Sequence, residues 1–231
     1  MLVLAIDTST KIGSVALYEK GRGLLGEITL NSGNNHSENI MDSIDQLFKL
    51  TGKKTEEIDR VAVSTGPGSF TGIRIGVAVA KGLAYSLGCE IVGINELDMI
   101  ANLAGDFQGE IISLIDARKE RTYFAGYRKE DGVFIRKTEY RDGELIDLLR
   151  NYKGKETLFL GDGALNYKSL ITSTMGESAK FYPDVMSLPR ASVLASLASE
   201  KNPDNLMGLE PYYVNKSQAE REKEAREKGS V

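Results

Sequence analysis

Two short runs of the sequence place an acidic residue directly after an apolar stretch. Asp7-Thr8-Ser9 follows the apolar run Leu2 to Ile6, and Asp116-Ala117-Arg118 occupies the same place after a second run. A carboxylate at the end of a strand, beside free backbone amides, can hold Mg²⁺ and the phosphates of a nucleotide. The same residue types also satisfy backbone groups in ordinary turns. Both interpretations stay open on these residues alone.

Glycine-rich turns follow two further apolar runs. Gly66-Pro67-Gly68 comes after the first, and Gly161-Asp162-Gly163 after the second. A dinucleotide-binding loop is disfavoured because Pro67 removes an amide donor and the chain opens with a hairpin instead of a βαβ unit. No Gly-Lys-Ser or Gly-Lys-Thr ends either loop, which excludes a Walker A site. The candidate nucleotide-binding residues are therefore Asp7, Thr8, Ser9, Asp116, Gly161 and Gly163.

Other catalytic chemistry has little support in the composition. The chain of 231 residues contains one histidine, His36, and one cysteine, Cys89, which cannot build a zinc or di-iron site of the usual ligands. A net charge of -4 argues against direct binding of the chain to nucleic acid. No apolar run has the length of a membrane span, and the N-terminus has the pattern of a buried strand and not of a signal peptide. We expect a cytoplasmic protein that reaches any nucleic acid through a partner.

The stretch after Gly68 has the clearest helical pattern. Ser69 is a suitable N-cap, Gly88 a suitable stop, and one apolar face runs along Ile73, Val77, Ala80, Ala84 and Leu87. A row of small residues at four-residue spacing lets another backbone approach closely; it consists of Gly72, Gly76, Ala80 and Ala84. The row either packs the helix between its own sheet and a neighbouring helix, or faces another protein chain.

The surrounding elements predict a mixed sheet covered by helices. Strands are expected at Leu2 to Ile6, Ser14 to Glu19, Leu24 to Leu30, Arg60 to Ser64 and Glu90 to Ile94. Helices are expected at Ser37 to Leu50, with Asn35 and Glu38 forming a capping pair, near Glu96 to Leu103, and at Ser187 to Glu200. The first half is thus a hairpin followed by a βαβ unit.

The second half repeats this plan. With Asp7 laid on Asp116, an ungapped overlay also matches Ala16 with Ala125 and Tyr18 with Tyr127. Such a repeat predicts two related lobes whose Asp-ended strands face a shared cleft. We expect an N-terminal lobe over residues 1–105 and a C-terminal lobe over residues 106–214. Residues 215–231 are rich in Glu, Lys and Arg, which is typical of a solvated helix or a disordered tail.

These residues together resemble the TsaB (YeaZ) family. The resemblance rests on the start Leu4 to Thr10, on His36-Ser37-Glu38, and above all on the string from Gly66 to Gly76, GPGSFTGIRIG. Asp116-Ala117-Arg118 and Pro211 to Val214 fit the same pattern, so the resemblance covers roughly residues 1 to 219. It implies a two-lobed α/β fold of the actin-like ATPase class (ASKHA, ribonuclease H-like), in which each lobe is a mixed sheet with helices.

The resemblance also implies a function. The family supplies the partner subunit for the threonylcarbamoyl modification of adenosine 37 in tRNAs that read ANN codons. Its catalytic relative TsaD holds metal with two histidines in an HxxxH element, and here Glu96 and Ile100 stand in those places. The chain would therefore be a non-catalytic subunit. The segments Ser37 to Leu50 and Thr71 to Leu87 would form the dimerisation surface, whose candidate residues are Ile40, Ile44, Gly72, Ile73, Gly76, Val77, Ala80 and Ala84.

The implied partners are TsaD, in a heterodimer, and the ATPase TsaE. The isolated chain is expected to pair with itself, and tRNA is reached only through the complex. The rival hypothesis is an actin-fold ATPase or phosphotransferase that uses Asp7 and Asp116 with magnesium and ATP or ADP in the cleft. A metallopeptidase, an older assignment attached to the wider family, lacks metal ligands here.

Overall fold

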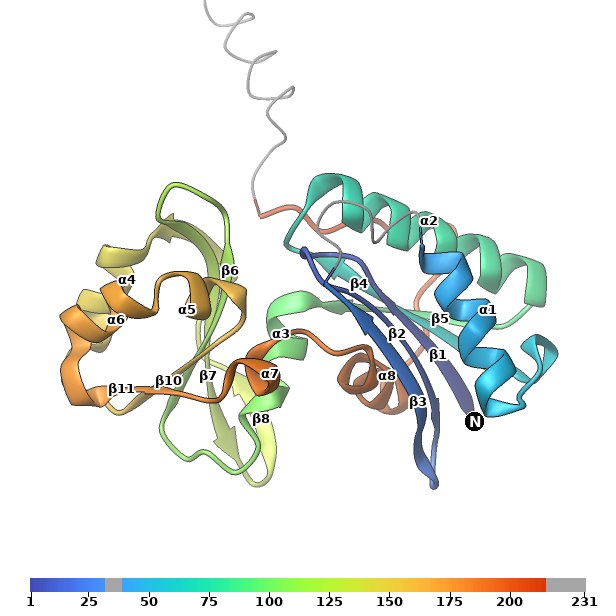
Figure 1. The fold of residues 1–231 in the computed structure, drawn as a ribbon, viewed down its shortest axis with the longest axis horizontal. Helices are drawn as coiled ribbons and strands as arrows, with labels where there is room; N and C mark the ends of the chain where they lie inside the picture. Colours follow the sequence, from blue (N-terminus) through green and yellow to red (C-terminus); the bar gives the residue numbers. More distant parts are fainter. Residues whose placement is uncertain (32–38, 215–231) are drawn as a thin grey trace, which may run out of the picture.

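Two mixed sheets form the framework of the protein in the computed structural model, which describes residues 1–31 and 39–214 (Figure 1). The first sheet has the order β3-β2-β1-β4-β5. Its strands are β1 (Leu2–Asp7), β2 (Gly13–Glu19), β3 (Gly23–Leu30), β4 (Arg60–Gly66) and β5 (Glu90–Asn95). β1 pairs with β2 antiparallel and with β4 in parallel, so the hairpin and the βαβ unit predicted from the sequence share one sheet.

The second sheet repeats the arrangement of the first. Its order is β11-β10-β6-β7-β8, with the short β9 also paired to β7. The strands are β6 (Glu110–Asp116), β7 (Arg121–Glu130), β8 (Val133–Arg136), β9 (Arg141–Glu144), β10 (Thr157–Leu160) and β11 (Ala179–Phe181). β6 pairs antiparallel with β7 and parallel with β10, as β1 does with β2 and β4. This shared topology is what the internal repeat predicts.

Helices cover both faces of the first sheet. α1 (Ile40–Thr51) and α2 (Phe70–Leu87) lie on one face, and α8 (Ala191–Glu200) lies on the other (Figure 1). A 3-10 turn, η2 (Thr55–Glu57), leads into β4. The helix predicted from Ser37 is described only from Ile40, so the capping pair Asn35 and Glu38 and the lone His36 lie outside the described residues.

The remaining helices belong to the second lobe and to the junction. The second sheet carries α4 (Leu145–Tyr152), α5 (Asp162–Asn166), α6 (Lys168–Met175) and the 3-10 turn η4 (Gly176–Ser178), and α7 (Asp184–Ser187) follows β11. Between the lobes lie α3 (Glu96–Ala101) and the 3-10 turn η3 (Asn102–Ala104). The helix predicted over Ser187 to Glu200 begins only at Ala191, as α8; Ser187 is the last residue of α7, and Pro189 lies between the two helices, where it has no backbone N–H to donate.

One apolar core runs through both lobes. It contains Val3 and Ala62 from the first sheet, Leu97 from α3, and Ile111 and Leu158 from the second sheet, each 0% exposed. Tyr127 on β7 and Tyr140 also donate hydrogen bonds of 2.8 and 2.6 Å to the two carboxylate oxygens of Asp98 on α3. The lobes are therefore joined by shared packing as well as by polar contacts.

The chain returns to the first lobe after the second sheet. α8 packs across β1 to β5, and the following strap, residues 201–214, is hydrogen-bonded to β5, to the end of β4 and to α2. Asp204 N donates to Ile91 O and Tyr212 N to Thr65 O, both at 2.8 Å. The predicted C-terminal lobe, residues 106–214, is thus corrected: its last part covers the first sheet, because the apolar face of α8 fills the side of that sheet left open by α1 and α2.

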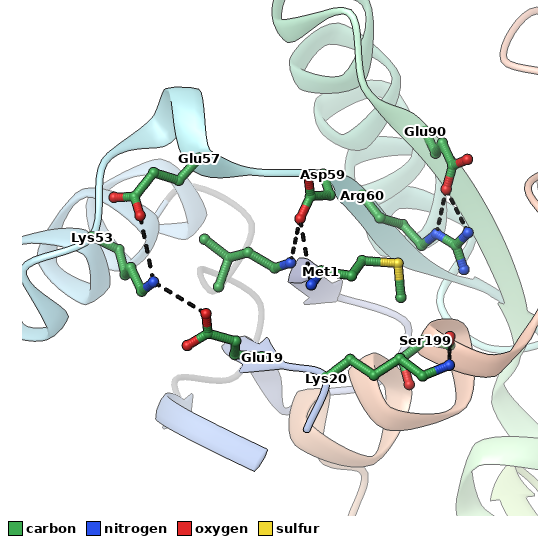
Figure 2. Close-up of polar contacts among 10 residues, drawn as sticks. Met1, Glu19, Lys20, Lys53, Glu57, Asp59, Arg60, Glu90 and Ser199 are labelled. Carbon is green, nitrogen blue, oxygen red and sulfur yellow. Dashed lines mark hydrogen bonds and ion pairs between the residues drawn. The ribbon is translucent and has the colours of Figure 1, made fainter. Parts of the chain in front are cut away.

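A buried arginine fixes the end of α8. Arg60 on β4 is 6% exposed; its Nη1 donates to the carbonyls of Ala198 and Lys201, while its Nε lies 2.9 Å from Glu90 Oε2. Figure 2 shows this Arg60–Glu90 pair beside Asp59, which accepts a hydrogen bond from the backbone amide of Leu2. The guanidinium satisfies carbonyls that the helix end leaves without partners.

Candidate functional site

The turn before α2 is pressed against the loop that follows β1. Ser69 caps the helix as the sequence predicts, its Oγ accepting from Gly72 N at 3.2 Å, and Ser69 N donates to Ser9 O at 2.6 Å. A Cβ added at Gly68 would lie 2.1 Å from Ser9 O. This turn glycine therefore serves a close backbone approach within the chain.

The small-residue row of α2 faces its own chain. A Cβ at Gly72 would lie 2.0 Å from Thr8 O, and one at Gly76 would lie 2.5 Å from Thr8 Oγ1. Ala80 and Ala84 are 0% exposed within the core beneath the helix. Within this chain the small side chains of Gly72 and Gly76 make room for Thr8 in the loop after β1, which favours packing of the helix against its own sheet over contact of this row with another protein.

The other predicted interface residues are buried in the same way. Ile40, Ile44, Ile73 and Val77 are between 1% and 4% exposed and join the core under α1 and α2. They attach the two helices to the sheet. All eight residues predicted for the interface are thus interior residues of this chain.

The outward face of α2 carries a different set of residues, which we call the outer stripe. It follows the spacing i, i+4, i+7, i+11 and i+14 and consists of Thr71, Ile75, Ala78, Gly82 and Tyr85. Tyr85 is 70% exposed, and a Cβ at Gly82 would meet nothing within 4 Å. The sequence contains this pattern, but α2 is apolar on more than one side, so periodicity alone does not distinguish the buried face from the exposed one.

The Asp7 loop uses its polar groups internally. Asp7, Thr8 and Ser9 are 0%, 2% and 0% exposed. Ser9 donates to Asp7 Oδ1 from its backbone N at 2.9 Å and from its Oγ at 2.7 Å, and Thr8 Oγ1 donates to Gly72 O at 2.7 Å. The hydroxyls that could meet a phosphate are already bound to the chain itself.

A second buried carboxyl lies beside Asp7. Glu96, the first residue of α3, is 0% exposed and accepts a hydrogen bond of 2.7 Å from Ser64 Oγ. Burial raises its pKa well above the ordinary value of 4.5, the charge of Asp7 adds to the rise, and hydrogen bonds from Ser64 and Ser9 oppose it. Sequence reasoning placed Glu96 only where a related enzyme has a histidine, and no local pattern signals its pairing with Asp7.

The Asp116 loop of the second lobe is also satisfied by its neighbours. Asp116 Oδ1 accepts from Tyr167 OH and from Arg118 N at 2.7 Å, and its Oδ2 accepts from Asn166 Nδ2 at 3.0 Å. Asp162 accepts from Asp116 N at 3.1 Å, and burial raises the pKa of Asp162 to about 6. The charge of Asp162 also raises the pKa of Glu96, so the acids of the two lobes face one another at the junction.

The glycines of the second turn allow two segments to pack. Gly161 has a positive φ of 97°, and a Cβ there would lie 2.2 Å from Leu114 O. A Cβ at Gly163 would lie 3.0 Å from Leu114 Cβ. Both residues bring the start of α5 against β6, so they do not form an open phosphate loop.

A magnesium-bound nucleotide does not fit these residues as they are arranged. The carboxylate of Asp7 is fully buried, the nearby hydroxyls are bonded within the chain, and Asp116 already accepts three hydrogen bonds. Across residues 1–31 and 39–214, no group of three His, Cys, Asp or Glu side chains is arranged to hold a metal ion. Within the same ranges, no helix is long and apolar enough to cross a membrane.

Comparisons with known proteins agree with this fold. The family model described as TsaD: tRNA N6-adenosine threonylcarbamoyltransferase matches residues 23–222. The TsaB protein of Bacillus subtilis is 32% identical over 222 residues, covering 95% of this chain and 96% of that protein. The Desulfovibrio desulfuricans tRNA N6-adenosine threonylcarbamoyltransferase is 35% identical, but the match covers only 46% of this chain and 33% of that enzyme.

Solved structures show the same architecture. YeaZ from Pseudomonas aeruginosa superposes with a TM-score of 0.77 at 24% identity, over 92% of this chain and 99% of that one. The ethanolamine utilization protein EutJ from Carboxydothermus hydrogenoformans gives a TM-score of 0.53 at 12% identity, over 84% of this chain and 89% of that one.

The two related mixed sheets, joined by α3 and covered by helices, define a two-lobed protein of the actin-like ATPase fold. Sequence similarity over nearly the whole chain then identifies the family within this fold class. The chain belongs to the TsaB family, which acts in the biosynthesis of threonylcarbamoyladenosine in tRNA, within the wider group covered by the TsaD model.

Proposed function

We propose that this chain is a non-catalytic subunit that pairs with TsaD through the outer stripe of α2 and thereby activates threonylcarbamoyl transfer to N6 of adenosine 37 in tRNA. The observation that carries the proposal is the outer stripe itself. Its middle positions, Ala78 and Gly82, are small and exposed, while Ile75 and Tyr85 supply apolar surface on either side. A helix with this pattern accepts a second helix at close range.

The surface around the outer stripe favours a protein partner. α1 lies beside α2 on the outside of the first lobe (Figure 1), and its Met41 is 48% exposed. On the opposite flank, Lys81 Nζ donates to Met207 O and Leu209 O at 3.0 Å, which holds the strap against α2. The outer stripe contains no charged residue, and the centres of protein interfaces are likewise depleted of charge. Without TsaD, a second copy of this chain is the natural occupant.

The junction between the lobes supports a role without chemistry of its own. An enzyme that binds nucleotide between two lobes needs accessible ligands and room to open. Here the ligands are bonded internally, and one apolar core spans the lobes. The net charge of -4 favours contact with tRNA through the complex, and TsaE would join the TsaD-bound form.

The test is Gly82→Glu. The added side chain enters open space, and glutamate favours a helix over glycine by about 0.5–1 kcal/mol, so the variant should fold at least as well as the wild type. A charge in the packed centre of an interface costs several kcal/mol, so we expect loss of co-elution with TsaD on size exclusion and loss of threonylcarbamoyl transfer in the reconstituted system.

Thr172→Glu is the matched control, because it adds the same charge to an exposed helical position on α6 of the other lobe. It should co-elute and support transfer as the wild type does. Co-elution of Gly82→Glu with TsaD at wild-type affinity would contradict the proposal. Magnesium-dependent ATP hydrolysis by the isolated chain, abolished by Asp7→Ala, would favour the rival ATPase instead.

A further inference from the structure

A pocket of about 460 Å³ opens in the second lobe, away from α2 and from the lobe junction. The pocket lies between α4, β9 and the part of β7 around Phe124. Figure 1 shows α4 on the side of the second sheet that faces away from the first lobe. The volume of the pocket falls in the range typical of small-molecule sites. Phe124, Leu148 and Tyr152 supply apolar surface, and Arg141, Asn151 and Lys155 supply polar groups.

The lining of the pocket carries four acids, Glu110, Asp142, Glu144 and Asp147, and two cations, Arg141 and Lys155; with the three arginines that pair its acids from outside, the charged side chains sum to +1. Three of its acids are paired with arginines: Glu110 with Arg128, Asp142 with Arg121 and Asp147 with Arg150. The fourth, Glu144, is exposed, and its charge acts on Arg121. Arg141 and Lys155 line the same pocket and form no ion pair with any residue of the described part of the chain. These two cations are therefore available to a ligand.

One of the two cations lies over a tyrosine ring of the pocket. Lys155 Nζ is 5.3 Å from the centre of the Tyr152 ring. Burial and then the charge of Glu110 raise the pKa of Tyr152, and the charges of Arg128 and Arg141 oppose that rise. A Cβ at Gly126 would lie 2.6 Å from the Tyr152 hydroxyl, so the glycine keeps space for that group. The pocket thus combines two cations without an ion-pair partner, four acids of which three are paired with arginines, a neutral hydroxyl and aromatic surface.

We propose that this pocket binds a small organic phosphate with a planar ring, of the nucleoside monophosphate class. A phosphate monoester carries a charge between about -1.5 and -2 near neutral pH. It therefore balances two cations better than a ligand with a single carboxylate would. The planar guanidinium of Arg141 suits bidentate contact with phosphate oxygens, and Lys155 adds a point charge. The ring lies against Phe124 and Tyr152, whose faces favour stacking.

The test is calorimetric titration of the full chain with AMP, with adenosine and inorganic phosphate as partial ligands. We expect saturable one-to-one binding of AMP and weaker binding of each partial ligand. Arg141→Gln and Lys155→Gln should each weaken AMP binding by about tenfold, because each removes one charged contact. Lys180→Gln, at an exposed position on β11 of the same lobe, should bind AMP like the wild type.

Nuclear magnetic resonance places the ligand independently. AMP should shift the amide resonances of Gly126 and Gly143, which border Tyr152 and Phe124, and leave that of Gly82 on α2 unchanged. Absence of saturable binding at millimolar AMP, or equal binding by the two pocket variants and Lys180→Gln, would overturn the proposal. Equal binding of phosphate and AMP would overturn the ring contact. Tighter binding of a 5′-phosphorylated oligoadenylate than of AMP would overturn the assignment of a free nucleotide as the ligand and would indicate an RNA 5′ end instead.

Discussion

Ser64 on β4 donates a hydrogen bond of 2.7 Å to Glu96 on α3, and both side chains are buried, at 2% and 0% exposure. The bond links the strand before the Gly66-Pro67-Gly68 turn to the helix between the lobes. It also holds Glu96 beside Asp7, where burial and the neighbouring charge favour the protonated carboxyl.

The first prediction concerns the pH dependence of stability. The pKa of Glu96 is raised in the folded state above its ordinary value of 4.5, so the folded protein binds more protons than the unfolded chain above that pH. Stability therefore falls as pH rises from about 4.5 through the folded pKa, by up to about 1.4 kcal/mol for each pH unit in that window. Asp162, with a pKa of about 6, adds to the same trend.

Glu96→Gln should flatten this dependence, because glutamine resembles the protonated carboxyl and does not titrate. Urea denaturation at several pH values between 5 and 9 measures the effect, with the exposed Glu177→Gln as the matched control. The control should follow the wild type. A Glu96→Gln profile parallel to that of the wild type would show that the Glu96 carboxyl does not bind the extra proton.

The second prediction separates the two partners of a buried arginine. Arg60 is 6% exposed and serves both the end of α8 and Glu90, whereas the Glu90 side chain is 48% exposed. Arg60→Met leaves two carbonyls and a carboxylate without their partner and should cost about 2–4 kcal/mol in unfolding free energy. Glu90→Gln should cost less than about 1 kcal/mol, because the half-exposed carboxylate is screened by water. Equal losses in chemical denaturation would contradict this account.

Much of the fold could be predicted because its signals are local. The hairpin of β2 and β3, the Ser69 cap and the Gly88 stop each depend on neighbours within a few residues, and the structure contains all three. The repeat anticipated the matching sheet order. The sheet against which α8 packs could not be predicted from the sequence. The amphipathic pattern of α8 indicates that one face is buried, but it does not indicate which sheet covers that face.

The candidate site is less predictable from sequence than the fold, because its contacts are not local. Residue type alone indicates Asp7, Thr8 and Ser9, yet their role depends on Gly72 and Glu96, which are distant in sequence. The pairing of Asp98 with Tyr127 and Tyr140 likewise forms only when the second lobe docks on α3. Sequence patterns identify polar residues, whereas the contacts that satisfy them are set by tertiary packing.

The third prediction tests which face of α2 is internal. Gly72→Ala would bring a methyl group to 2.0 Å from the backbone oxygen of Thr8, which cannot move without shifting the loop after β1, so we expect a loss of about 2–3 kcal/mol. Gly82→Ala adds the same methyl group to open space on the outer stripe and should gain about 0.5–1 kcal/mol from helix propensity. Because the chemistry is identical, each variant is the control for the other. Urea denaturation of both, read as midpoint shifts of opposite sign, checks the assignment; shifts of the same sign would mean that the two faces of the helix have been interchanged.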